Sequence, residues 1–128
     1  MPAMTKILII EDQPNNMRLI EQILQDMDPE MELLKAETGT RAIQIAKDNV
    51  CDLVLTDIAL PDMDGVKISG IIRGCKGYEK VPIIAVTAYA MSKDEELFRE
   101  LFNDYISKPI DEASFENTIR KWIGETGV

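Results

Sequence analysis

The sequence predicts an α/β fold in which five short strands alternate with helices and form a doubly wound parallel sheet. Helix-length segments with apolar residues at helical spacing separate the expected strands. Parallel strands need such crossover connections, and parallel strands buried on both faces read as continuous apolar runs. The five apolar runs are KILII at 6–10, MELLKA at 31–36, DLVLT at 52–56, PIIAVT at 82–87 and DYIS at 104–107.

The helices expected between and after these strands are amphipathic. One more helix is expected after Asp64-Gly65, a turn signal that follows the third strand. The apolar positions at helical spacing are Leu19, Ile20, Ile23, Leu24 and Met27 in 16–27, Ala42, Ile43 and Ala46 in 39–49, Leu97, Leu101 and Phe102 in 91–102, and Phe115, Ile119, Trp122 and Ile123 in 112–123.

The second strand, 31–36, is short and half polar, which suits the edge of a sheet. With five strands, the flavodoxin-like order 2-1-3-4-5 is the natural doubly wound choice, and ligands of such folds bind beyond the carboxyl ends of the strands. The chain shows no linker, low-complexity tract or internal repeat. We therefore expect one domain over 1–128, with a core of about 5–124.

The composition excludes several kinds of functional site. The chain contains no histidine, which removes imidazole metal sites and the serine or cysteine triads. Cys51 and Cys75 lie too far apart in sequence for a Cys-x-x-Cys pair, so both are expected to be reduced. The 23 acidic and 14 basic residues leave a net charge of −9, which disfavours direct binding to nucleic acid and fits a divalent cation or a basic protein surface.

No membrane attachment is expected. The sequence has no run of about 18 apolar residues, and its N-terminus, MPAMTKILII, lacks the features of a signal peptide. We therefore expect a cytoplasmic protein.

Charged and polar residues follow four of the predicted strands. Glu11 and Asp12 follow the first strand, Asp57 the third, Thr87 ends the fourth, and Lys108 follows the fifth. Because parallel strands end at one edge of the sheet, these side chains should converge there. Three carboxylates so close raise one another's pKa unless a cation relieves the repulsion. Mg²⁺ suits such a set best, since it prefers oxygen ligands and commonly binds one or two carboxylates together with a phosphate.

This set of residues suits phosphoryl transfer. A carboxylate beside a metal ion is a recognised nucleophile that forms an aspartyl phosphate, which is the role expected for Asp57. Lys108 supplies positive charge for phosphoryl oxygens, and the Thr87 hydroxyl can donate a hydrogen bond to one of them. Phosphoryl transfer asks little more of a protein than positioning and charge neutralisation. A calcium loop of the EF-hand type is disfavoured, because DIALPDMDG lacks its ligand pattern.

Four segments, ILIIEDQPNN, VLTDIALPDMDG, IIAVTAYA and YISKPI, together resemble the signature segments of response-regulator receiver domains of two-component signalling. The resemblance covers essentially the whole chain. It implies that Asp57 is the phosphoacceptor and that Asp57, Glu11, Asp12 and the Ala59 backbone carbonyl hold Mg²⁺. Many relatives carry Asp-Asp where this chain has Glu11-Asp12, so Asp12 is the expected direct ligand and Glu11 acts through water.

The same resemblance assigns the remaining site residues. Thr87 matches the switch hydroxyl, Lys108 the phosphate-contacting lysine and Tyr105 the switch aromatic. The Lys108–Pro109 peptide bond is expected to be cis, as it is in the family.

The implied function is that of a signalling switch. A histidine kinase or histidine phosphotransfer protein would donate the phosphoryl group. A downstream protein would then read the face formed by the helix at 91–102, the strand at 104–107 and the helix at 112–123. The chain is not expected to be an enzyme, beyond assisting its own phosphorylation and slow dephosphorylation.

Several alternatives remain open at this stage. The chain could be a free regulator or a receiver excised from a hybrid histidine kinase. An Mg²⁺-dependent phosphatase of the haloacid-dehalogenase type is disfavoured, since those enzymes carry an acid where this chain has Ala59. A flavodoxin-like module that works without phosphorylation is the third class. Among single residues, Asp12 could cap the following helix, and Asp62 and Asp64 are interpreted as turn residues and not ligands.

Overall fold

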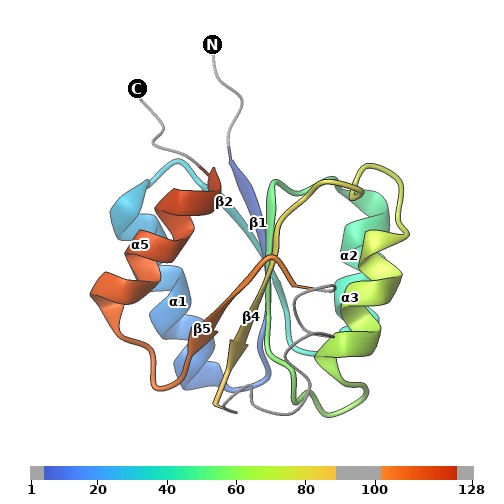
Figure 1. Cartoon of the computed structure of the whole chain (residues 1–128), viewed down its shortest axis with the longest axis horizontal. Helices are drawn as coiled ribbons and strands as arrows, with labels where there is room; N and C mark the ends of the chain where they lie inside the picture. Colours follow the sequence, from blue (N-terminus) through green and yellow to red (C-terminus); the bar gives the residue numbers. More distant parts are fainter. Residues whose placement is uncertain (1–4, 89–101, 124–128) are drawn as a thin grey trace.

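A computed structural model describes residues 5–88 and 102–123 (Figure 1). All five strands lie within one residue of their predicted limits, and the predicted segment 91–102 lies outside the described residues except for Phe102, which is buried. The elements are β1 (Lys6–Ile10), α1 (Pro14–Met27), β2 (Glu32–Ala36), α2 (Gly39–Asp48), β3 (Leu53–Thr56), α3 (Gly65–Arg73), β4 (Ile83–Thr87), β5 (Asp104–Ser107) and α5 (Glu112–Ile123).

The strands form one parallel sheet in the order β2-β1-β3-β4-β5, which confirms the predicted flavodoxin-like topology. The half-polar β2 lies at an edge, as predicted. Helices α1 and α5 cover one face of the sheet, and α2 and α3 cover the other (Figure 1). All strands run in the same direction, so the residues that follow them lie along one rim, at the lower edge of Figure 1.

The apolar core is divided by the sheet into two clusters. Successive residues of a strand point to opposite faces, so Leu8 and Ile10 contact the α2 and α3 side, whereas Ile7 and Ile9 contact the α1 and α5 side. Strands β3 and β4 are likewise buried along their whole length. This burial on both faces explains why the central strands read as continuous apolar runs in the sequence.

The helices bury narrower stripes than their sequences indicated. In α1, Ile20, Ile23 and Leu24 are buried, but Leu19 is 37% exposed. Leu19 is one of the apolar residues at helical spacing, but it lies at the margin of the face that meets the sheet. In α2 the buried apolar residues include Ile45, whereas the predicted Ile43 is half-buried.

The amino end of the sheet is held by Tyr78, which is completely buried. Its hydroxyl donates to the Asn49 carbonyl and accepts a hydrogen bond of 3.0 Å from the Cys51 N–H. Burial raises the pKa of Tyr78, so the hydroxyl keeps its proton. The side chain therefore joins the segment after α3 to the segment that leads into β3.

Arg73, at the end of α3, connects the segments that precede β4 and β5. Its Nη1 donates to the carbonyls of Tyr78 at 3.1 Å and Val81 at 2.6 Å, and its Nη2 donates to Asn103 Oδ1 at 3.0 Å. The same Asn103 oxygen accepts the Ile83 N–H at 2.8 Å. One guanidinium thus satisfies several carbonyl groups where the two strands begin.

None of the helices in the described parts of the chain is both long enough and apolar enough to cross a membrane.

Candidate functional site

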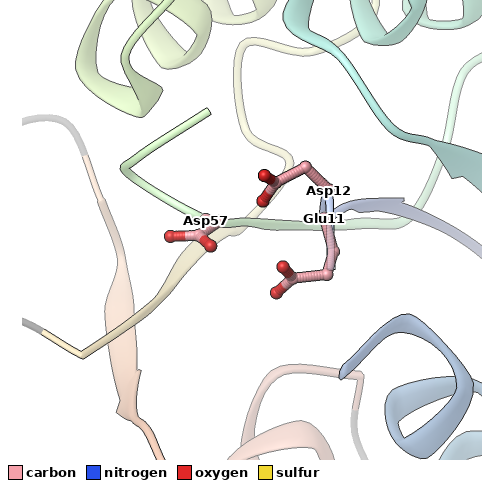
Figure 2. A group of neighbouring side chains, drawn as sticks. All are labelled: Glu11, Asp12 and Asp57. Carbon is pink, nitrogen blue, oxygen red and sulfur yellow. The ribbon is translucent and has the colours of Figure 1, made fainter. Parts of the chain in front are cut away.

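Three carboxylates meet at the carboxyl end of the sheet. Glu11 and Asp12 directly follow β1, and Asp57 directly follows the neighbouring strand β3 (Figure 2). One oxygen from each of the three lies within 4.8 Å of the others. Glu11 is 1% exposed and Asp57 is 6% exposed, while Asp12 is half-buried. The sheet therefore brings together the three acids that the sequence predicted to converge.

Backbone hydrogen bonds between the strands align these acids. The Asp57 N–H donates to the Ile10 carbonyl at 3.0 Å, which continues the pairing of β3 with β1 by one residue. The Glu11 N–H donates to the Ala36 carbonyl at 3.0 Å, which continues the pairing of β1 with β2. The positions of the first and third strand ends are thus set by the sheet itself.

Lys108 places its ammonium group between two of the acids. Its Nζ lies 2.7 Å from Asp57 Oδ2 and 2.9 Å from Glu11 Oε1. Lys108 follows β5, and its N–H donates to the Thr87 carbonyl at the end of β4 at 2.9 Å. The Lys108–Pro109 peptide bond is cis. The side chains of Lys108 and Glu11 are only 13% and 1% exposed, so this pair is shielded from solvent.

Burial and charge act in opposite directions on this ion pair. Burial raises the pKa of Glu11, and the lowering effect of Lys108 and of the Gln13 N–H does not overcome it. Burial by itself would lower the pKa of Lys108, but hydrogen bonds and charge from Asp57 and Glu11 outweigh it, so the pKa is raised. Burial outweighs the other effects for Glu11 and is outweighed by their sum for Lys108, because the Glu11 side chain is the more deeply buried of the two.

The cluster suits a hard divalent cation. Glu11 Oε2 accepts the Gln13 N–H at 3.0 Å, but Oε1 is buried and accepts no well-oriented hydrogen bond from the described residues, despite its ion pair with Lys108. Asp12 does not cap α1, whose cap position is Gln13 with no side-chain hydrogen bond. The donor set consists of carboxylate oxygens, which Mg²⁺ prefers. Asp12 thus has no structural role in capping that would compete with metal binding.

The loop after β3 folds back over Asp57. The Ala59 N–H donates to Asp57 Oδ1 at 3.2 Å, and the Gly65 N–H donates to the Ile58 carbonyl at 2.7 Å. Gly65 is required here, because a Cβ at this position would lie 2.6 Å from the Asp57 carbonyl oxygen. Asp64 caps α3 by accepting the Lys67 N–H at 2.7 Å. The start of α3 is therefore packed directly against the backbone that carries Asp57.

Asp62 does more than form a turn, which corrects the sequence interpretation. Its Oδ1 accepts the Gly39 N–H at 2.8 Å, and its Oδ2 accepts the Thr40 N–H at 3.0 Å and the Thr40 hydroxyl at 2.7 Å. The loop after β3 is thereby bound to the start of α2. No motif or periodicity in the sequence links residues 22 or 23 positions apart, so sequence reasoning missed this contact.

The two predicted switch residues lie close to the same rim. Thr87 ends β4, is 3% exposed and pairs with Ser107 of β5. Tyr105, in β5, is half-buried and packs against the cluster on the α2 and α3 side. Most of the helix predicted at 91–102 lies outside the described residues.

The sequence matches one family model and several individual proteins. The family model described as the response regulator receiver domain matches residues 7–120. The chain is 36% identical over 127 residues to the signal transduction histidine-protein kinase BarA of Escherichia coli, which covers 98% of this chain and 14% of the kinase. It is also 35% identical over 124 residues to the polar-differentiation response regulator DivK of Brucella ovis, which covers 95% of this chain and 99% of the regulator. The chain thus spans only a small part of the kinase and nearly all of the regulator.

Solved structures give the same picture. The receiver domain of a sensor histidine kinase from Pseudomonas aeruginosa, with magnesium coordinated in its active-site cleft, matches with a TM-score of 0.84 and 33% identity over 96% of this chain and 100% of that domain. The chemotaxis protein CheY4 of Vibrio cholerae matches with a TM-score of 0.87 and 21% identity over 94% of this chain and 99% of that protein, a likeness in fold alone.

Proposed function

The chain belongs to the response regulator receiver domain family of two-component signalling, and on this premise we propose that it accepts a phosphoryl group on Asp57 from a phosphohistidine of a partner protein. The observation that carries the proposal is the position of Asp57. Its carboxylate lies at the end of a buried strand, beside two further acids and 2.7 Å from the ammonium of Lys108, which also contacts Glu11. This arrangement combines a nucleophile with the charges that phosphoryl transfer requires.

The proposed step makes one bond and breaks one. An oxygen of the Asp57 carboxylate attacks phosphorus, the bond between phosphorus and the imidazole nitrogen of the donor breaks, and the imidazole leaves with the electron pair and becomes protonated from solvent. Lys108, already within 2.7 Å of Asp57 Oδ2, would remain beside the phosphoryl oxygens and offset their negative charge. The chain has no histidine, so the donor is another protein or a small phosphorylated molecule.

Asp12, Asp57 and the Ala59 carbonyl are proposed as direct ligands of Mg²⁺, with Glu11 acting through water. The convergence of the three carboxylates supports this assignment. When bound, Mg²⁺ supplies positive charge that neutralises the acids and the incoming phosphoryl group. The carboxylates of this chain orient that charge, and the buried Glu11 keeps Lys108 close to Asp57 through its 2.9 Å ion pair.

The output of the switch is proposed to come from Thr87 and Tyr105. Thr87 would rearrange toward the phosphoryl group, and Tyr105 would turn inward, since it is only half-buried in this structure. The two residues belong to neighbouring strands, which supports a linked movement. A downstream protein would then bind the face made by the segment 91–102, β5 and α5, as a shift in population between two states.

The proposed partners are a histidine kinase or a histidine phosphotransfer protein, without direct binding to nucleic acid or membrane. The chain could act as a free regulator, as the match with DivK along nearly its whole length supports, or as the receiver part of a hybrid kinase, as the match with BarA supports. The cytoplasmic location and the single domain over 1–128 stay predictions.

Receiver domains are signalling switches and generally not enzymes, and we propose the same for this chain. A phosphatase of the haloacid-dehalogenase type remains less favoured, because Ala59 stands two residues after Asp57 and offers no acid or base. Sustained hydrolysis of a generic phosphate ester would favour that alternative.

The test is phosphorylation of Asp57→Asn by phosphoramidate and by phosphorylated histidine kinases in the presence of Mg²⁺. Wild type should gain one phosphoryl group by mass spectrometry, and Asp57→Asn none. Asp64→Asn is the matched control, because it removes an acid seven residues away in the same loop while Asn can still cap α3. Equal labelling of wild type and Asp57→Asn would refute the assignment.

A further inference from the structure

We propose that Asp62 is a positioning residue for the metal site: by binding the N-terminus of α2, it holds the loop that carries Asp57 and Ala59 and strengthens Mg²⁺ binding. This inference rests on the proposed function, because it concerns the same site. Asp62 itself is not a ligand in this proposal. Both of its carboxylate oxygens are already engaged by Gly39 and Thr40.

The contact with Asp62 adds acceptors to those that α2 has within its own segment. Thr38 already caps α2 in the usual local way, with its hydroxyl accepting the Arg41 N–H at 3.1 Å. Asp62 accepts the two preceding amides, those of Gly39 and Thr40, so the first three N–H groups of α2 all have side-chain acceptors. Asp62 belongs to the loop after β3, whereas Thr38 directly precedes α2. The hydrogen bonds of Asp62 therefore fix the position of the loop on the helix.

Side-chain packing reinforces the same contact. Met63, the residue after Asp62, covers Gly39 so closely that a Cβ there would lie 2.5 Å from its Cγ. Met63 also packs against the apolar cluster beneath α2 and α3. The loop is therefore held on α2 by the hydrogen bonds of Asp62 and by the van der Waals contact of Met63 with Gly39.

The loop has anchors on both sides of its proposed ligand. Ala59 lies between the end of β3 and Asp62, and its N–H donates to Asp57 Oδ1 at 3.2 Å. On the far side, Asp62 holds the loop to α2, and Asp64 holds it to α3. Pro61 between Ala59 and Asp62 restricts the backbone further, because its φ is fixed by the ring. A displacement at Asp62 would thus be transmitted to Ala59 and Asp57.

The start of α2 is also close in sequence to the other acidic strand end. Only Glu37 and Thr38 separate α2 from Ala36, whose carbonyl accepts the Glu11 N–H at 3.0 Å. The segment from Ala36 to the start of α2 therefore makes two contacts. One is with the end of β1, which carries Glu11 and Asp12, and the other is with Asp62 in the loop after β3. This segment thus links the loop after β3 to the end of β1, in addition to the direct pairing of β1 with β3 in the sheet.

Asp62 keeps its charge under all ordinary conditions. Hydrogen bonds from the Thr40 hydroxyl and, to a smaller extent, from the N–H groups of Gly39 and Thr40 lower the pKa of Asp62 to about 2. The positive end of the α2 dipole favours the same charged form. The contact is therefore constant across neutral pH.

The test compares Asp62→Ala with Thr38→Val. Both variants remove side-chain acceptors from the N-terminus of α2, but only Asp62 belongs to the loop after β3. ¹⁵N-labelled proteins are titrated with MgCl₂, and the amide shifts of residues 11, 12 and 57–59 report binding. We expect Asp62→Ala to bind Mg²⁺ about tenfold more weakly, at the lower end of the range for residues that support metal ligands. Thr38→Val should stay within about twofold of wild type.

Graded variants provide further readouts. Thr40→Val removes one of the three hydrogen bonds to Asp62 and should weaken Mg²⁺ binding less than Asp62→Ala, whereas Thr40→Ser should bind as wild type does. Thr40→Val also tests the inference if Asp62→Ala does not fold. Amide hydrogen exchange without metal should accelerate at residues 58–60 in Asp62→Ala and not in Thr38→Val.

The outcomes separate this inference from the proposed function. If wild type binds Mg²⁺ and is phosphorylated, but Asp62→Ala binds Mg²⁺ equally well, the inference fails and the proposed function stands. Equal weakening by Asp62→Ala and Thr38→Val would also overturn it, because helix stability would then explain both. A wild type that does not bind Mg²⁺ would refute the inference and the proposed metal site together.

Discussion

The two ends of the sheet differ in how far their buried polar groups are satisfied. At the carboxyl end, buried acids of like charge gather around one lysine, and Glu11 Oε1 is left without a well-oriented hydrogen bond from the described residues. At the amino end, Tyr78 and Arg73 satisfy neighbouring polar groups and fill buried space. The difference teaches that binding capacity is concentrated at one end and stability at the other.

The reason lies in the cost of burying charge. Burial raises the pKa of Glu11, which means that its charged form is disfavoured in the folded protein. A site that binds a cation keeps such charges because the cation compensates for them. At the amino end, the polar groups of Tyr78 and Arg73 are paired within the chain. Variants at the two ends should therefore separate stability from phosphorylation.

The largest loss of stability is expected from Tyr78→Ala. The substitution empties a completely buried site and leaves the Asn49 carbonyl and the Cys51 N–H without their partner, at a cost of about 3 to 5 kcal/mol. Urea unfolding measures the change. Tyr78→Phe, which removes only the hydroxyl, should lose about 1 kcal/mol. If Tyr78→Ala unfolded at the same urea concentration as wild type, the amino end would not have the stabilising role described above.

Arg73→Met comes next, with an expected loss of about 2 kcal/mol, since the carbonyls of Tyr78 and Val81 lose a charged donor. Met retains much of the apolar stem. Thermal unfolding measures the stability, and labelling by phosphoramidate at a temperature where the variant is folded measures the chemistry. The labelling rate should equal that of wild type. A slower rate in fully folded Arg73→Met would contradict the separation of the two ends.

A smaller effect is expected at the α3 cap, which lies beside the site. Asp64→Ala should lose about 1 kcal/mol, because the Lys67 N–H loses its acceptor, while Asp64→Asn should lose only a few tenths. Chemical denaturation distinguishes the two. Comparable losses in both variants would indicate that the charge of Asp64, and not its capping oxygen, stabilises this region.

The smallest effect is a pH dependence at Glu11. Its pKa is raised in the folded protein, so its contribution to stability is fully present below its unfolded pKa of 4.5 and is lost as the pH rises through the folded pKa. Glu11→Gln lacks this titration. Without divalent cations, the stability of Glu11→Gln relative to wild type should therefore increase from pH 4 toward neutral pH in urea unfolding. A difference that does not vary with pH would contradict the raised pKa.

Much of the site was predictable because the carboxyl ends of parallel strands all lie at the same edge of the sheet. Once the apolar runs were identified as parallel strands, Glu11, Asp12, Asp57, Thr87 and Lys108 had to lie along one rim. Their roles as ligand, nucleophile and switch residues remain predictions that the experiments above test.

Other contacts had no sequence signal. The burial of Ile45 and the exposure of Leu19 depend on how each helix rotates on the sheet, which period alone does not determine. Asp62 had the composition of a turn residue, and only the approach of α2 to the loop after β3 turned it into an acceptor for Gly39 and Thr40.

The sequence by itself determined the strands, their order and the presence of Asp57 at a strand end, because these depend on local apolar pattern and on the connections that parallel strands require. The tertiary structure alone decided that Lys108 contacts both Glu11 and Asp57, and that Asp62 binds α2. Those contacts join segments distant in sequence through a few atoms, and their geometry exists only when the surrounding layers have packed.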